Sequence, residues 1–308
     1  EMTDGSINTL KNMIQKRVKN GEINSFDDDA INELIKYLCR KCSSKKNIVM
    51  EDYTIDRALQ IASDYSKERG DTVITAEDVV NAAYEKDLIE KEFIDLYKDN
   101  KILISLNDKK IGAINALAVL DTGYYTFGRP MRITCVAYKG TGRIIDIQKE
   151  SNLSGKIHEK SINILKGLLS NILNPYEEIP IDFHICFEQT YGMVDGDSAS
   201  IAEIVALLSA LAKRGIKQNI AVTGSVNQFG EVQAIGGVNE KIEGFYNVCK
   251  LIDTIEGKGV IIPYSNKDEV ILNPEVEKAV CEGSFDIYTM KNINDAIEVL
   301  ILEENETL

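Results

Sequence analysis

The chain has 308 residues, of which 44% are hydrophobic and 27% charged, a composition typical of globular proteins with about two domains. Its 49 acidic residues outnumber its 35 basic residues, and the net charge of −14 disfavours phosphate backbones, so we expect no nucleic-acid partner. The sequence has no apolar run of the roughly 18 to 20 residues that a membrane helix needs, and its N-terminus lacks the apolar core of a secretory signal. We therefore expect a soluble cytoplasmic protein with no membrane partner.

Residues 1–98 are predicted to form an α-helical domain, because their apolar residues recur at helical spacing. The first predicted helix ends at Gly21, and the fourth begins with a Thr75 cap and Asp78 three residues later, a variant of the capping box. The predicted helices cover residues 7–21, 26–42, 52–70, 73–87 and 88–100.

Residues 99–308 are predicted to form a mixed α/β domain, which makes the fold class of the whole chain α+β. Two apolar strand-like runs flank an Asn-Asp turn signal within residues 101–120. Further strands are predicted at residues 132–138, 142–148, 181–187, 218–226, 258–263 and 285–290. Helices are predicted at residues 158–173, in the run that follows Ser198, and at residues 239–250, 273–281 and 293–304.

Six cysteines are present, and two of them, Cys39 and Cys42, form a Cys-x-x-Cys pair. A structural zinc site needs a second such pair or closely spaced histidines, but His158 and His184 lie far from this pair in the sequence. We therefore predict free thiols and no metal site. The other cysteines lie mostly in apolar runs and are expected to be small core residues.

Neither a nucleotide site nor a calcium site is predicted. The phosphate-binding pattern G-x-x-x-x-G-K-[ST] is absent, so we expect no ATP cofactor in this chain by itself. Asp195 and Asp197 could ligate a cation, but the twelve-residue calcium-loop pattern is also missing.

Residues 190–215 place Asp-Gly-Asp-Ser directly before a long apolar run that is predicted to be helical. Ser198 is therefore either a helix cap or a nucleophile at a helix N-terminus. The G-x-S-x-G pattern of another class of serine hydrolases is absent. As a nucleophile Ser198 needs a base, for which the sequence offers His184 on a predicted strand and Lys241 near a helix start.

Lys241 follows a Gly-Gly turn near the start of a predicted helix. Burial lowers the pKa of a lysine from its ordinary value of about 10.4, and at a pKa of about 8 roughly 10% of the amine is neutral at pH 7. A neutral Lys241 could accept the proton of Ser198, and the N–H groups at the helix start could bind an oxyanion. Taken individually, Ser198 also fits an ordinary helix cap, and Lys241 also fits a solvated surface charge.

The segment "MVDGDSASIAEIVALLSALAKRGIKQNIAVTGSVNQFGEVQAIGGVNEKIEGF" resembles the proteolytic core of the Lon proteases, which are Ser-Lys peptidases. The D-G-x-S-A loop, the A-V-T-G strand, the G-x-V-x-x-I-G-G turn and the E-K helix occur in the family's order, and the loop is closer to the B-type branch. The resemblance covers most of residues 100–300. The segment "DTGYYTFGRPMR" departs from the family's usual loop and is expected to lie near the substrate groove.

The resemblance implies that Ser198 is the nucleophile and Lys241 the general base. It also implies that Thr223 orients the lysine, and that the backbone N–H groups of Asp197 and Ser198 lie near the oxyanion. The implied function is a serine endopeptidase that cleaves unfolded polypeptides. A non-catalytic assembly or substrate-docking module and a Ser-Lys amidase for small molecules are the alternatives.

For residues 1–98 the resemblance implies the small α-helical lid of an AAA+ ATPase module. Its sensor arginine should lie in the helix that contains Arg57. The chain is then expected to be either the C-terminal part of an ATP-dependent protease whose motor is absent or a member of a Lon-like group that lost the motor. ATP and magnesium are expected only with the preceding AAA+ half. A homo-hexameric ring and unfolded or damaged proteins are the expected partners.

Overall fold

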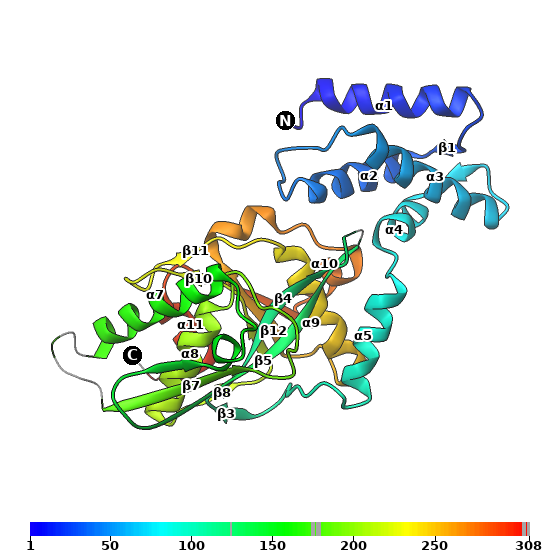
Figure 1. Cartoon of the computed structure of the whole chain (residues 1–308). Coiled ribbons are helices and arrows are strands. Elements are labelled where there is room, and N and C mark those ends of the chain that lie inside the picture. Colours follow the sequence, from blue (N-terminus) through cyan, green and yellow to red (C-terminus); the bar gives the residue numbers. More distant parts are fainter. Residues whose placement is uncertain (124, 174–175, 177–179, 304–305, 307–308) are drawn as a thin grey trace. The chain divides into compact units, whose positions relative to one another are not determined.

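The computed structural model describes residues 1–123, 125–173, 176, 180–303 and 306 (Figure 1). The chain divides into two compact units. The first unit comprises Glu1–Leu88 and Asp268–Lys278, and the second comprises Ile89–Lys267 and Ala279–Leu308. Among the residues that the structure describes, no helix has the length and hydropathy that crossing a membrane requires.

The division lies at residues 88 and 89, ten residues before the predicted boundary. Helix α5 (Leu88–Lys98) accounts for the difference. Its Phe93 ring contacts the ring of Phe127 at a centroid distance of 5.9 Å, and its Tyr97 hydroxyl donates to the carbonyl of Pro130 at 2.7 Å. These contacts, which the local pattern of residues 88–100 does not reveal, attach the helix to the second unit.

The first unit is helical around one apolar core. It contains helices α1 (Asp4–Lys19), α2 (Asp28–Lys41), α3 (Asp52–Glu68) and α4 (Ala76–Tyr84), and the short parallel strands β1 (Ser25–Phe26) and β2 (Val73–Ile74). Leu10, Leu34 and Ile55 are among the fully buried residues of this core. The predicted capping box is confirmed, because the N–H of Thr75 donates to the Asp78 carboxylate at 2.9 Å.

The second unit is built on a seven-stranded mixed sheet in the order β13-β12-β9-β4-β5-β7-β6. Its strands are β4 (Ala113–Asp121), β5 (Thr126–Lys139), β6 (Ile144–Asp146), β7 (Ile181–Phe187), β9 (Ile220–Val222), β12 (Lys258–Pro263) and β13 (Phe285–Met290). Strand β5 runs antiparallel to β4 and β7, whereas β4, β9, β12 and β13 are parallel to one another. The predicted α+β class is therefore confirmed.

Two small antiparallel pairs accompany this sheet: β3 (Lys109–Ile111) with β8 (Gly215–Lys217), and β10 (Ser225–Val226) with β11 (Val232–Gln233). The helices that follow α5 are α6 (Ile147–Glu150), α7 (Lys156–Leu173), α8 (Ser200–Ala212), α9 (Val238–Ile252), α10 (Pro274–Cys281) and α11 (Ile293–Leu300), with a 3₁₀ helix at Tyr264–Glu269.

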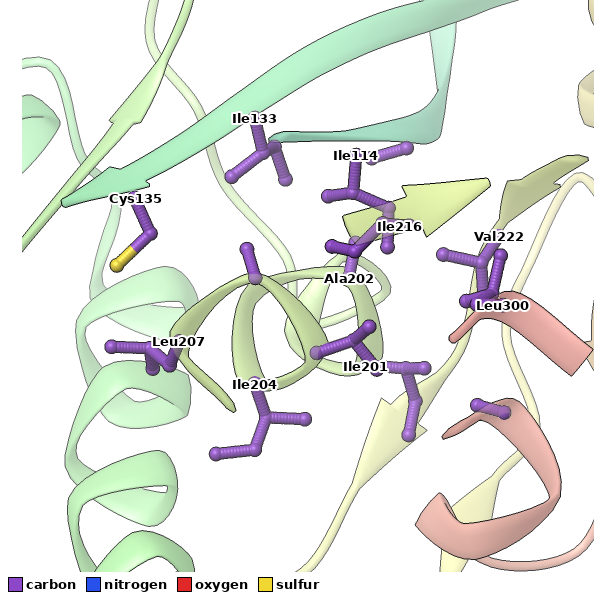
Figure 2. Packing of buried hydrophobic residues seen from close by; sticks show 14 of the residues in the cluster. Ile114, Ile133, Cys135, Ile201, Ala202, Ile204, Leu207, Ile216, Val222 and Leu300 are labelled. Atoms are coloured by element: carbon purple, nitrogen blue, oxygen red, sulfur yellow. The ribbon is translucent and has the colours of Figure 1, made fainter. Parts of the chain in front are cut away.

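Helix α8 is apolar on nearly all sides, which is typical of a helix enclosed by other elements. Figure 2 shows Ile114 and Ile133 of the sheet on one side of α8, with Leu300 of α11 nearby. Successive residues of a strand face opposite sides of a sheet, so Gly128 of β5 points away from Ile133 and toward α9. The sheet thus separates α8 from α9.

Three predicted strands differ from the structure. The run at residues 101–106 forms no strand, the strand at residues 142–148 ends at Asp146, and the strand at residues 218–226 divides into β9 and β10. At the last division, the N–H of Gly224 donates to the carbonyl of Ser198 at 2.8 Å. The chain leaves the sheet there to contact the loop before α8.

The segment at residues 121–132, expected to be a loop, forms most of a hairpin, although Tyr124 lies outside the described residues. Strand β5 already begins at Thr126 and pairs with Asp121 of β4. Pro130 within the segment disfavours a strand, because proline cannot donate to a neighbouring strand. Pairing of β5 with β7 begins only at Ile133, so Pro130 has a single neighbouring strand and its missing donor costs little.

Candidate active site

A cavity of about 730 Å³ in the second unit brings together segments that are distant in the sequence. Asp197 and Ser198 come from the loop before α8, Lys241 from the first turn of α9, and Arg129 and Met131 from β5. Residues of β4, of the turn before α9, and of the end of β7 with the loop that follows it also line the cavity. The two residues predicted to react, Ser198 and Lys241, therefore line the same cavity.

The backbone of Ser198 is held by the two residues that follow β9. Its carbonyl accepts hydrogen bonds from the Thr223 hydroxyl at 3.1 Å and from the N–H of Gly224 at 2.8 Å. Two residues later, the Ser200 hydroxyl donates to the carbonyl of Asp197 at 2.8 Å and accepts from the N–H of Val226 at 3.0 Å. These bonds fix the loop through its main chain, and Ser198 itself lines the cavity.

Lys241 is only 3% exposed, although it carries an amine. Burial lowers its pKa to about 8, even though the carboxylates of Asp197 and Glu240 act to raise it. Helix α9 begins directly after Gly237, whose φ of 67° is a conformation that glycine adopts readily. Within the described residues, Lys241 Nζ is hydrogen-bonded neither to Ser198 Oγ nor to the Thr223 hydroxyl.

Two glycines bring α9 against β5 and so determine where Lys241 lies. A Cβ atom on Gly128 would lie 1.8 Å from the carbonyl oxygen of Glu240 and 2.7 Å from the backbone nitrogen of Lys241. A Cβ atom on Gly244 would lie 2.1 Å from the carbonyl oxygen of Gly128. Because backbone atoms cannot yield as a side chain can, both positions require glycine.

Replacing Gly128 by alanine is expected to push the start of α9 away from β5. Overpacking of this kind costs about 1–3 kcal/mol of unfolding free energy. A displacement near 1 Å at a reacting group can cost about a hundredfold in rate. Thermal unfolding and peptide-hydrolysis kinetics check both effects. Gly5→Ala in α1 is the matched control, because its added Cβ makes only an ordinary contact at 3.6 Å. A Gly128→Ala variant with unchanged stability and activity would contradict this account of where Lys241 lies.

The two acidic residues before Ser198 have separate surroundings. Asp197 accepts a hydrogen bond from the Ser225 hydroxyl at 2.8 Å. Asp195 accepts from the N–H groups of Gly196 at 2.9 Å and Ile157 at 3.1 Å. The bond from the Gly196 N–H is the main cause that lowers the pKa of Asp195. No group of three or more potential metal ligands occurs within the described residues.

The N–H groups of Asp197 and Ser198 were predicted to face an oxyanion. Neither donates a hydrogen bond to a protein acceptor within the described residues. Both residues line the cavity. Acyl-transfer reactions use unpaired N–H groups of this kind to bind a developing oxyanion.

The two histidines lie outside this arrangement. His184 packs edge-on against Tyr138 with a centroid distance of 5.4 Å on β7, and it does not line the cavity. His158 is buried beside two carboxylates, Asp146 and Glu203. This second cluster was not predicted from the sequence, although an acid within the apolar helix α8 was a sign of it.

The Cys-x-x-Cys pair and Arg57 lie in the first unit. Cys39 and Cys42 are free thiols, as are the other four cysteines of the chain, and the backbone N–H of Cys42 caps the end of α2. Arg57 is exposed on α3.

Comparison with known proteins shows which protein family the chain matches. A family model described as the Lon protease C-terminal proteolytic domain matches residues 94–303. A Lon protease homologue of Escherichia coli is 44% identical over 203 residues, which are 65% of this chain and 35% of that protein. A Lon protease homologue of Haemophilus influenzae is 35% identical over 288 residues, covering 90% of this chain and 47% of that protein. An archaeal Lon protease of Pyrococcus abyssi is 29% identical over 298 residues, covering 95% of this chain and 28% of that protein. The chain thus spans less than half the length of each of these relatives.

Proposed function

Because this chain belongs to the Lon protease family, we propose that its second unit hydrolyses peptide bonds with Ser198 as the nucleophile and Lys241 as the general base. The family match identifies a Lon-type serine protease domain. One observation carries the assignment of roles: a buried lysine with a pKa of about 8 lines the same cavity as a serine at the start of a helix.

The proposed reaction begins with the neutral amine of Lys241, which takes the proton of the Ser198 hydroxyl as its oxygen attacks the peptide carbonyl. The N–H groups of Asp197 and Ser198 bind the oxyanion, and the Lys241 ammonium then protonates the departing amine. A water molecule activated by Lys241 releases the acyl group from Ser198. At a pKa of about 8, roughly 10% of the amine is neutral at pH 7, enough to sustain the first step.

The Ser198 hydroxyl and the Lys241 amine must approach each other in this reaction. Catalytic hydrogen bonds are often long in unliganded enzymes and tighten when substrate binds. The hydrogen bonds from Thr223 and Gly224 to the Ser198 carbonyl leave the side chain free to turn toward the amine.

The direct experiment compares an unstructured fluorogenic peptide with simple amides of the same leaving amine, using the 308-residue chain. Our proposal predicts turnover of the peptide and little turnover of the simple amides. Turnover of the simple amides alone would indicate an amidase. Absence of both activities, together with no acylation of Ser198, would favour the non-catalytic docking module.

Replacing Thr223 by valine is expected to lower kcat about tenfold with little change in KM. Thr223 is fully buried and donates to the Ser198 carbonyl, and such a bond contributes about 1 kcal/mol. Its hydroxyl lone pairs also remain available to orient Lys241. Steady-state kinetics on the peptide measure the effect, and Thr223→Ser should retain most activity. A Thr223→Val enzyme as active as the wild type would exclude both roles of the hydroxyl.

The wider assembly is also a proposal. We infer that the first unit is an AAA+ lid, which is supported by relatives whose match extends over 90% or more of this chain. ATP and magnesium would then act through a preceding AAA+ half, and unfolded or damaged proteins would reach a homo-hexameric ring. The six free thiols are consistent with the reducing cytoplasm.

A further inference from the structure

Three buried ionisable side chains from three elements meet in the second unit, and one of them, His158, contacts the loop that carries Ser198. Asp146 ends β6, His158 lies in the first turn of α7, and Glu203 lies in the first turn of α8. Their exposed fractions are 2%, 1% and 0%. His158 Nε2 lies 3.0 Å from Asp146 Oδ2, and His158 Nδ1 lies 3.8 Å from Glu203 Oε1.

Glu203 is the unusual member of this cluster, because neither of its carboxyl oxygens has a hydrogen-bond partner among the described residues. Its separation of 3.8 Å from His158 Nδ1 is too long for a hydrogen bond. Burial raises the pKa of Glu203 to about 7; Asp146 acts in the same direction and His158 opposes it. A buried carboxyl group without partners is costly to the fold, so its presence needs a reason beyond stability.

His158 connects this cluster to the nucleophile loop through its main chain. Its backbone N–H donates to Asp195 Oδ1 at 3.3 Å, three residues before Ser198. The neighbouring Gly155 N–H donates to the carbonyl of Val194 at 2.8 Å. One residue therefore contacts the loop before Ser198 with its backbone and approaches the helix after Ser198 with its ring.

We propose that His158, held between Asp146 and Glu203, is a positioning residue for Ser198, and that an ionised Glu203 draws the start of α8 toward the His158 ring. The inference rests on the proposed function of Ser198. In this arrangement the ring fixes the spacing between the two segments that flank the nucleophile. The attraction requires a protonated His158 ring beside an ionised Glu203, and the raised pKa of His158 favours that state. When Glu203 is protonated, the attraction is lost and the loop is held less firmly.

The charged groups that act on the cluster define its pH dependence. Burial acts to lower the pKa of His158, but the hydrogen bond to Asp146 and the charges of Glu203 and Asp195 outweigh it, so the pKa is raised. Glu203 has a folded-state pKa of about 7, above its ordinary value of 4.5. Its contribution to stability is therefore fully present below pH 4.5 and lost as the pH rises through 7. Ionised Glu203 thus weakens the fold while it positions Ser198.

Glu203→Gln, which removes the charge and keeps the shape, is the central test. At pH 8.5 the wild type should exceed this variant about tenfold in kcat, whereas at pH 5.5 the two should be about equal. The variant should also unfold at a higher temperature at pH 8.5. Opposite changes in activity and stability are not expected of a residue that only supports the fold. A wild-type to variant ratio that does not change with pH would overturn the inference.

Further variants make the test specific. His158→Gln should reduce kcat at pH 8.5 as much as Glu203→Gln does, and the double variant should be no worse than either. Losses of kcat that add in the double variant would overturn the inference. If the His158→Gln variant does not fold, the pH dependence of the Glu203→Gln variant decides the test. Lys258→Gln is the control, because Lys258, a buried lysine at the start of β12, forms an ion pair at 2.9 Å with the solvent-exposed Asp253. The Lys258→Gln variant should lower the unfolding temperature without changing the pH dependence of kcat.

Amide hydrogen exchange of residues 190–200 gives a measurement independent of catalysis. At pH 8.5 it should accelerate in Glu203→Gln and stay unchanged in Lys258→Gln. If exchange responds but no Ser198-dependent hydrolysis is found, the proposed function fails and the connection through His158 stands. If hydrolysis depends on Ser198 but neither exchange nor the pH ratio responds, the inference alone fails.

Discussion

Replacing Ser198 by alanine is expected to abolish peptide hydrolysis while leaving the fold intact. Removal of the nucleophile from a serine peptidase lowers kcat by about a millionfold. The loop should persist, because the Ser198 carbonyl accepts the hydrogen bonds from Thr223 and Gly224 that hold it. Steady-state hydrolysis of the unstructured peptide and thermal unfolding measure the two effects.

Ser200→Ala is the matched control for this change. The Ser200 hydroxyl is buried, donates to the carbonyl of Asp197 and accepts from the N–H of Val226. Its removal should lower stability by about 1–3 kcal/mol and retain measurable turnover. If Ser198→Ala kept its activity and Ser200→Ala lost all of it, the nucleophile assignment would be wrong.

Replacing Lys241 by methionine is expected to abolish hydrolysis and stabilise the protein. Lys241 has a folded-state pKa of about 8 instead of 10.5, which is unfavourable to the fold by about 3 kcal/mol once the pH lies below 8. The direction of the pH dependence follows from the lowered pKa of Lys241. The destabilisation is absent above pH 10.5 and grows as the pH falls toward 8. Methionine resembles the lysine stem and carries no charge.

Chemical denaturation of wild type and Lys241→Met at pH 7 and pH 10.5 measures this gain. The unfolding free energy of the variant should exceed that of the wild type by up to about 3 kcal/mol at pH 7, and the difference should shrink at pH 10.5. Lys241→Arg, whose side chain stays charged, is the control and should be inactive without the gain. A Lys241→Met variant that is less stable at pH 7 than the wild type would contradict a buried neutral amine.

Much of the fold could be predicted from the sequence where local patterns decide the structure. The capping box at Thr75 and Asp78 and the apolar run after Ser198 depend on nearby residues, and both form as expected. The α5 helix was predicted as an element, but its attachment to the second unit depends on Phe127 and Pro130, far along the chain. The same limit explains the missed hairpin, because Pro130 is tolerated only where β5 lacks its second neighbour.

The site was predictable only in part. The order of motifs singled out Ser198 and Lys241, but the close approach of Gly128 and Gly244 that places the lysine is a tertiary contact without a local pattern. Glu203 could have been recognised, because an acid in a helix that is apolar on all sides must be buried. Its neighbour His158 could not, because it comes from a separate helix.

The central claim, that a buried neutral Lys241 activates Ser198, is tested most directly by the pH dependence of Ser198 acylation. The full chain is treated with a serine-reactive acylating reagent, and mass spectrometry locates the modification. We predict modification at Ser198, at a rate that rises with pH to half its maximum near pH 8 and is lost in Lys241→Met. A rate that does not change with pH, or that survives the loss of Lys241, would contradict the account.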